Sequence, residues 1–148
     1  MTGKYFGQFE EGDTYTSQWK YLGESHFHRF CDLAGLREPL FESRGHADED
    51  DRWLIPGFMT VSMAAGLFSQ SGWTHETSLA LLEVGGIAWE NPVFAGDEFR
   101  IRVEVVDTVP TSSDRGGVTE LAWEGENRDG ETVLEMSTKH FIEKRSEE

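Results

Sequence analysis

The stretch 56–72 limits the possible folds more than any other part of the sequence. Its side chains are apolar, small or uncharged on nearly every side of a helical wheel. Pro56 suits the first turn of a helix, and Gly72 suits the left-handed residue that follows a helix end. A helix without a charged face is expected to be buried. The roughly 14 residues 58–71 would span about 21 Å, so we expect a sheet to wrap around this helix.

Gly66 lies in the middle of the predicted helix. Glycine at such a position costs about 1 kcal/mol relative to alanine. We therefore expect another part of the structure to approach the helix closely at Gly66.

The length and composition predict one domain with one core. The chain has 148 residues, of which 37% are hydrophobic and 12% aromatic. We expect residues 1–148 to form this domain, with 1–4 and 144–148 frayed. Cys31 is the only cysteine, so an intramolecular disulfide is excluded, and no basic-then-apolar leader opens the chain. No apolar run approaches the ~20 residues of a membrane span. These features predict a cytoplasmic protein.

The net charge of the protein limits which classes of partner it is expected to bind. The formal net charge is −15, from 28 acidic and 13 basic residues, and only four of the basic residues are lysines. Such a surface repels a phosphate backbone, so nucleic acid is not an expected partner. An acidic, lysine-poor composition is also typical of proteins in a salt-rich cytosol, where ions screen the repulsion between carboxylates. We therefore expect a halophilic protein.

The remaining periodicity predicts one short helix and an antiparallel sheet. Apolar residues recur at helical spacing in 27–34, where Gly23 or Ser25 can cap the start and Gly35 can end the helix. Period-two alternation predicts a strand at 99–105, and similar patterns predict strands at 15–21, 79–89, 119–124 and 131–142. A long helix wrapped by these strands is an α+β domain.

Glycines indicate where the strands bend and turn. The pair Gly85-Gly86 predicts a bulge or a close backbone approach inside its strand. The pair Asp129-Gly130 predicts a hairpin turn.

Residues 36–54 are the least regular part of the chain and are expected to form a long loop. Its acidic run 48–51 lacks the glycine and closing glutamate of a calcium loop, so a solvated segment is expected. His26 and His28 are two residues apart and do not share a helical face, so we predict no metal site for this pair.

Several short motifs together resemble the MaoC-like dehydratases, which are single hotdog domains. The resemblance rests on Tyr5-Phe6 with Gly12-Asp13, on residues 30–35 and 91–97, on Pro56-Gly57-Phe58, and on residues 127–130. It covers most of the chain and implies a curved antiparallel sheet around a long central helix.

The resemblance also implies an activity and a site. Members of this family, which includes (R)-specific enoyl-CoA hydratases, assemble as dimers or larger even assemblies and add water reversibly to a 2-enoyl thioester of CoA or of a carrier protein. An Asp and a His in the loop after the short helix handle the two protons. The N–H of a glycine at the start of the central helix, here Gly57, polarises the thioester carbonyl. We expect the acyl chain in an apolar tunnel beside Ser62 and Met63, and no cofactor besides the CoA thioester itself.

The sequence departs from the family pattern at both proton-handling positions. Leu36 stands for the aspartate and Phe41 for the histidine. Neither side chain can transfer a proton. Substitutes in the same loop are Glu38, Glu42 and His46, for each of which a solvated side chain is the simpler interpretation.

Four basic residues could contact a phosphate group of a ligand, but they could equally form ion pairs with acidic residues on the surface. In so acidic a chain, they are expected to pair with surface acids. The candidates are Arg44, Arg100, Arg102 and Lys139.

Three functions therefore remain open. The first is a hydratase or dehydratase with altered or lost catalysis, and the second is a non-catalytic subunit that completes a hotdog partner's acyl tunnel. The third, an acyl-CoA thioesterase, is less favoured because several such hotdog enzymes carry an essential carboxylate on the central helix, whereas 56–72 contains no acid.

Overall fold

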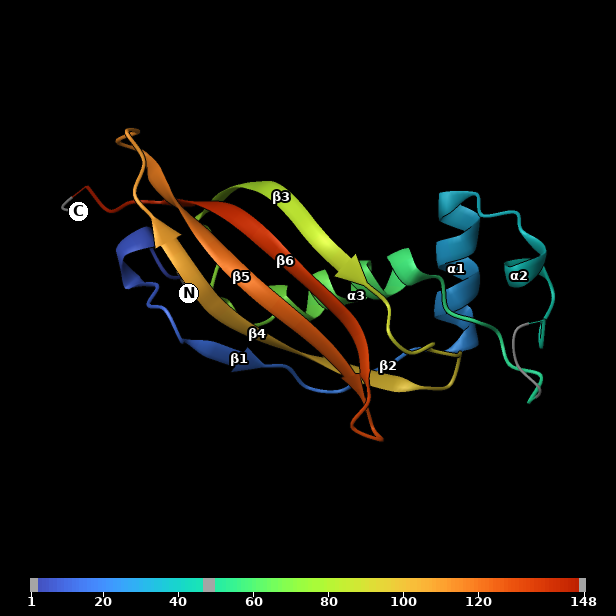
Figure 1. Ribbon diagram of the computed structural model, residues 1–148. Coiled ribbons are helices and arrows are strands. Elements are labelled where there is room, and N and C mark those ends of the chain that lie inside the picture. The colour runs from blue at the N-terminus through green and yellow to red at the C-terminus, as the bar shows by residue number, and fades with distance from the viewer. Residues whose placement is uncertain (1–2, 47–49, 147–148) are drawn as a thin grey trace.

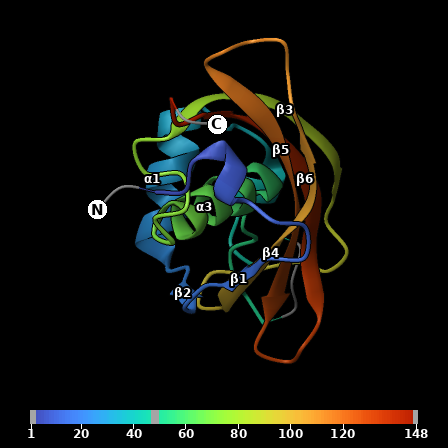
Figure 2. The same ribbon diagram turned by 90° about the vertical axis from the view of Figure 1, so that its left-hand side faces the viewer.

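One antiparallel sheet curves around helix α3 (Gly57–Ser69) in the computed structural model of the protein, which describes residues 3–46 and 50–146 (Figure 1). The order in the sheet is β1-β4-β5-β6-β3, and β2 also pairs with β4. In profile, the sheet lies on one side and α3 fills its concave face (Figure 2). The strands are β1 (Thr14–Thr16), β2 (Lys20–Tyr21), β3 (Ser78–Ala88), β4 (Glu98–Val109), β5 (Gly116–Asn127) and β6 (Thr132–Glu143).

Alternation along the long strands builds the core, as the sequence predicts. Four β4 side chains are at most 1% exposed and face the helix, namely Phe99, Ile101, Val103 and Val105. The predicted hairpin joins β5 to β6, and Gly130 adopts a φ of 79° in its turn. The predicted bulge is present in β3, where the register shifts between Gly85 and Ala88.

The short helix α1 (Glu24–Ala34) is also confirmed. Gly23 occupies its N-cap, and Gly35 ends it with a φ of 74°. The His26 Nδ1 atom accepts a hydrogen bond from the Gly23 N–H at 3.0 Å, so this histidine closes the first turn of the helix. Phe27 is fully buried and joins α1 to the core.

The sheet wraps around helix α3 as predicted, but within this chain it buries the helix on one side only, whereas the sequence predicts a buried helix. Met59, Ala64, Leu67 and Phe68 face the sheet and are buried. The opposite face carries small residues and Phe58, and is exposed because a single sheet has one concave side. A methyl group at Gly66 would meet no atom within 4 Å, so the predicted close approach is absent within the described part of this chain.

Two other sequence-based boundaries differ from the structure. The single strand expected at 15–21 is divided into β1 and β2, because the Ser17 backbone and side chain both bond to Ile101 and bend the chain. The expected loop 36–54 contains a short helix, α2 (Pro39–Glu42), and a single-turn 3-10 helix precedes β1 at Phe6–Gln8.

Some residues near the ends of the chain form backbone hydrogen bonds with the rest of the fold. The Gly3 and Lys4 N–H groups donate to the carbonyls of His75 and Trp73, and the Lys144 N–H donates to Arg115. The outermost residues of the segments expected to fray, 1–2 and 147–148, lie outside the described residues. So do residues 47–49, which include half of the acidic run 48–51. No helix within the described ranges is long and apolar enough to cross a membrane.

Candidate functional site

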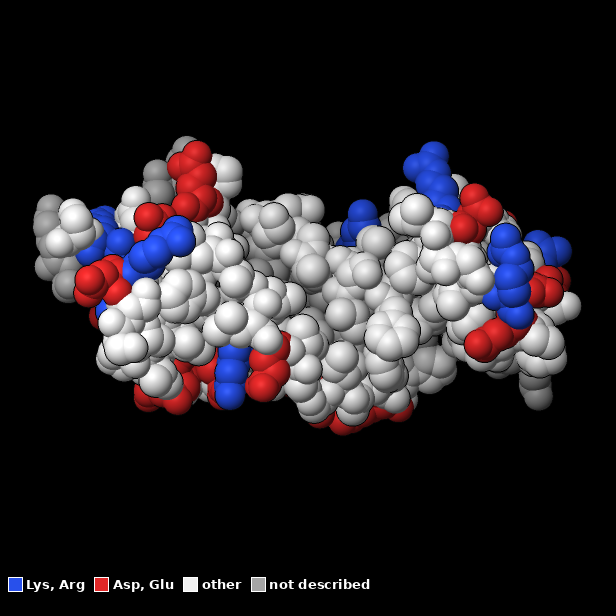
Figure 3. Space-filling model, turned by 90° about the horizontal axis from the view of Figure 1, so that it is seen from above, with Lys and Arg blue, Asp and Glu red and all other residues white. Residues whose placement is uncertain are grey.

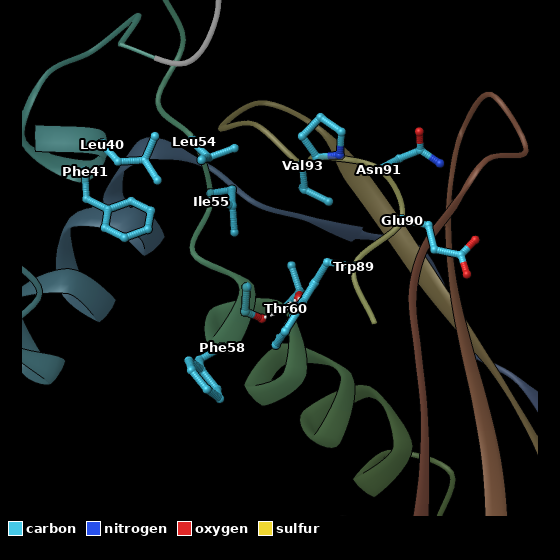
Figure 4. A pocket seen from close by; sticks show the side chains of 12 residues that line it. Leu40, Phe41, Leu54, Ile55, Phe58, Thr60, Trp89, Glu90, Asn91 and Val93 are labelled. Carbon is cyan, nitrogen blue, oxygen red and sulfur yellow. Dashed lines mark hydrogen bonds between the residues drawn. The ribbon is translucent and has the colours of Figure 1, made fainter. Parts of the chain in front are cut away.

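An apolar cavity of about 480 Å³ opens at the N-terminus of α3 (Figure 4). Helix α2, the segment before α3 and the loop after β3 supply its walls, so three distant parts of the chain meet there. The lining residues are Leu40, Phe41, Leu54, Ile55, Gly57, Phe58, Thr60, Trp89, Glu90, Asn91, Pro92 and Val93.

Trp89 lies directly against Gly57 in this cavity. Its Nε1 atom donates to the Gly57 carbonyl oxygen at 3.0 Å and to the Thr60 Oγ1 atom at 3.1 Å. A methyl group at position 57 would lie 2.7 Å from Trp89 Cε2, so only glycine leaves room for the indole ring. The Trp89 ring also meets the Phe58 ring edge-on, with 5.8 Å between centroids. Sequence analysis selected Gly57 but missed Trp89, which follows β3 and shows no local signal of this contact.

The first turn of α3 presents unused hydrogen-bond donors. The Pro56 carbonyl accepts from the N–H groups of Met59 and Thr60, at 3.0 and 3.3 Å. No described residue accepts from the N–H groups of Gly57 or Phe58. Free N–H groups at a helix N-terminus carry partial positive charge and favour an anionic or strongly dipolar acceptor.

The two positions that the resemblance assigns to the family dyad line one surface hollow beside α1. Phe41 of α2 lines the cavity at α3, and Figure 4 shows its ring beside Leu40 on one wall. Leu36 follows α1, is half-buried against the core, and lines the hollow beside α1 together with Cys31 and Phe41. Phe41 therefore lines both hollows, and the assignment of these two positions to the family dyad stays a prediction.

The suggested substitutes lie away from the cavity at α3. Glu38, Glu42 and His46 are all exposed, and none lines this cavity. Their positions are those of solvated side chains.

Ser62 and Met63 also lie outside the cavity lining. The Ser62 Oγ atom donates to the Phe58 carbonyl at 3.0 Å on the exposed face of α3. Met63 is half-buried against the core. Of the three residues proposed to bind substrate, Gly57 alone contributes to this wall.

Glu90 is the only titratable side chain that lines the cavity among the described residues. It lies at the rim, pointing away from the apolar walls (Figure 4). A hydrogen bond with Glu90 raises the pKa of Glu135 on β6, because a shared proton relieves the repulsion between the two carboxyl groups. Sequence analysis missed Glu90, which looks like any exposed acid at the end of a strand.

Three of the four basic residues considered for phosphate binding are paired with acids. Arg44 contacts Glu24 and Asp51, and Arg100 Nε lies 2.6 Å from Glu126 Oε1. Lys139 lies between Glu83 and Glu120. Pairing with surface acids therefore accounts for these three side chains.

Within 3–46 and 50–146, no three His, Cys, Asp or Glu side chains are grouped so that they could hold an ion.

A curved antiparallel sheet wrapped around one long helix, with a short helix in the preceding connection, is the hotdog fold. Solved structures with the same arrangement confirm the fold predicted from the sequence. They include a monoamine oxidase regulatory protein from Archaeoglobus, with a TM-score of 0.88, 21% identity, and coverage of 98% of this chain and 97% of that one. The MaoC-like dehydratase from Rhodospirillum rubrum gives a TM-score of 0.80 at 19% identity, covering 97% and 99% of the two chains.

Another neighbour is the (R)-hydratase PhaJ1 from Pseudomonas aeruginosa, with a TM-score of 0.78, 15% identity, and coverage of 95% and 86% of the two chains. The HadBC (3R)-hydroxyacyl-ACP dehydratase complex from Mycobacterium tuberculosis shares the fold at a TM-score of 0.71 and 18% identity, covering 88% of this chain and 96% of that one. No family model matches the sequence, and a search of curated proteins finds no relative. The similarity is therefore one of fold, and the structural neighbours include dehydratases and hydratases.

Proposed function

We propose that the protein binds an acyl thioester in the cavity at the N-terminus of α3. One observation carries this proposal. The N-terminus of α3 borders an apolar cavity, and its Gly57 and Phe58 N–H groups have no acceptor among the described residues. A thioester combines a dipolar carbonyl with an apolar chain. The carbonyl oxygen accepts from the Gly57 N–H, and the chain lies against the apolar walls.

We further propose that the isolated protein catalyses little or no hydration of a 2-enoyl thioester. The family dyad positions hold Leu36 and Phe41, and Glu90 points away from the cavity walls. A positioned acid or base contributes about 10²–10⁴-fold, so the loss of both leaves the reaction near background.

Calorimetry with an acyl-CoA, together with a hydration assay on crotonyl-CoA, tests both parts. We expect measurable binding and no turnover. A leucine-to-tryptophan change at Leu40, which lines the cavity, should weaken binding, whereas the same change at Leu33 on α1, which is 88% exposed, should not. Absent binding would contradict the thioester proposal, and robust turnover would contradict the loss of catalysis. In that case Glu90→Gln and alanine changes at Glu38, Glu42 and His46 would locate the catalytic group.

We also propose that the chain pairs with a second hotdog through the β3 edge and the exposed face of α3. Leu81, Leu82 and Val84 on β3 are 58%, 53% and 40% exposed. Figure 3 shows mostly uncharged side chains over the middle of this side of the molecule, whereas most of the charges lie toward its two ends. An uncharged, apolar surface on a chain with a net charge of −15 indicates a surface that a partner covers.

A homodimer is the simplest such assembly, and a different hotdog chain is the alternative. The missing dyad favours the alternative, because a non-catalytic subunit can complete the site of an active one. Sedimentation of the protein in molar salt should show an even assembly, and Leu82→Asp should dissociate it while Leu33→Asp should not. A wild-type monomer that pairs only when it is co-expressed with the product of a neighbouring gene would establish the alternative.

A further inference from the structure

The cavity at the start of α3 has aromatic walls. Three of its twelve lining residues are aromatic, namely Phe41, Phe58 and Trp89, whereas aromatic residues make up 12% of the whole chain. They come from α2, from α3 and from the segment after β3, and Figure 4 shows Phe41 and Trp89 on different walls. Apolar cavities of about 150 Å³ in other proteins hold a single benzene ring. At about 480 Å³, this cavity has room for a ring and the thioester group that carries it.

Hydrogen bonds hold the Trp89 ring in one orientation. Its N–H group is used by the Gly57 carbonyl and the Thr60 hydroxyl. The Thr60 hydroxyl is used as well, because it donates to the Gly57 carbonyl at 2.6 Å. Trp89 and Thr60 therefore have no free donor, and Trp89 presents a ring whose position is set before a ligand arrives.

A ligand carbonyl at Gly57 brings the neighbouring atoms of its acyl group close to Trp89. The carbonyl oxygen would lie about 2.9 Å from the Gly57 nitrogen. Trp89 lies so close to Gly57 that a methyl group there would be 2.7 Å from Trp89 Cε2. In an aroyl thioester the ring is bonded directly to the carbonyl carbon, so that ring is the part of the ligand that meets Trp89. Two aromatic rings attract each other edge-on or offset, which a saturated ring does not reproduce.

The walls also lack groups that would act on the acyl chain. Glu90 is the only titratable lining side chain among the described residues, and it points away from the walls. An aroyl group has no 2-enoyl double bond to hydrate, so a site that only binds it needs no positioned acid or base. The aromatic walls and the missing proton-transfer groups therefore favour the same class of acyl group.

We propose that the acyl group bound in this cavity is aromatic, with its ring attached directly to the thioester carbonyl and packed against Trp89. This inference rests on the proposed binding of a thioester at Gly57 and adds the class of acyl group. It does not depend on pairing with a second chain, because Leu81, Leu82 and Val84 of β3 do not line this cavity.

Calorimetric titration of the whole protein with benzoyl-CoA and with cyclohexanecarbonyl-CoA tests the inference. Both acyl groups carry a six-membered ring on the carbonyl carbon, and only the benzoyl ring is aromatic. We expect benzoyl-CoA to bind about two- to tenfold more tightly. Trp89→Leu should abolish this preference, and Trp89→Phe, which keeps a ring, should retain part of it. Trp19→Leu, at a half-buried tryptophan outside the lining, should retain all of it.

The ratio of the two affinities is the readout, because a change in the shape of the cavity weakens both ligands. Measurable binding of both esters to the wild type with equal affinity overturns this inference and leaves the thioester proposal standing. A preference that survives in Trp89→Leu overturns it as well. If neither ester binds and hexanoyl-CoA does not bind either, the thioester proposal itself fails, and this inference fails with it.

Discussion

Gly57→Ala tests whether Trp89 determines the geometry at the start of α3. The added methyl group would lie 2.7 Å from Trp89 Cε2 and 2.9 Å from Trp89 Nε1, which is closer than real side-chain contacts allow. The indole ring must therefore move. Because Trp89 is 43% exposed, it has room to swing toward solvent.

The displacement of Trp89 removes one shared hydrogen bond and one ring contact. The single indole N–H, shared between the Gly57 carbonyl and the Thr60 hydroxyl, contributes about 0.5–1.5 kcal/mol, and the edge-on contact with Phe58 contributes about as much. Alanine regains up to about 1 kcal/mol because it is the better helix former. We therefore expect the free energy of unfolding to fall by about 1–2 kcal/mol.

A double-mutant cycle provides the measurement. Urea unfolding is followed at one fixed protein concentration for the wild type, Gly57→Ala, Trp89→Ala and the double variant. In the Trp89→Ala background nothing opposes the methyl group, so Gly57→Ala should be neutral or stabilising. An equal loss of stability in both backgrounds would refute the reasoning, because the cost of the methyl group would then not come from Trp89.

Three further predictions concern the whole fold. The melting temperature should rise from low to molar potassium chloride, because salt screens the repulsion within a chain of net charge −15. An unchanged melting temperature would contradict the prediction that the protein is halophilic. Because the pKa of His140 is lowered in the folded state, the unfolded chain binds more protons than the folded chain below about pH 6.5. The free energy of unfolding should therefore decrease as the pH is lowered below that value. His140→Gln should show a smaller decrease than the wild type in matched melts. Phe27→Ala should cost about 3–5 kcal/mol in urea unfolding, because Phe27 is fully buried, whereas Phe58→Ala, at a residue 68% exposed, should cost much less.

The sequence by itself determined most of the helices, strands and turns. Period-two alternation at 99–105 places Phe99 and its partners on one buried face, because successive strand residues point to opposite sides. Gly35 and Gly130 mark a helix end and a hairpin turn, because both need a positive φ that glycine adopts without strain. The replacement of the family dyad by Leu36 and Phe41 stays a prediction from the resemblance.

The tertiary structure decided which side chains meet and which faces stay open. Trp89 reaches Gly57 across 32 residues because β3 curves back over the start of α3, and curvature leaves no local pattern in the sequence. Thr138 and His140 alternate like other inward residues of β6, and only the arrangement of α3 beside the β6–β3 edge of the sheet leaves a hollow next to them. The same limit explains the exposed face of α3. An apolar sequence predicts that a helix is buried, but the number of sides that are covered depends on what surrounds it, and one curved sheet covers one side.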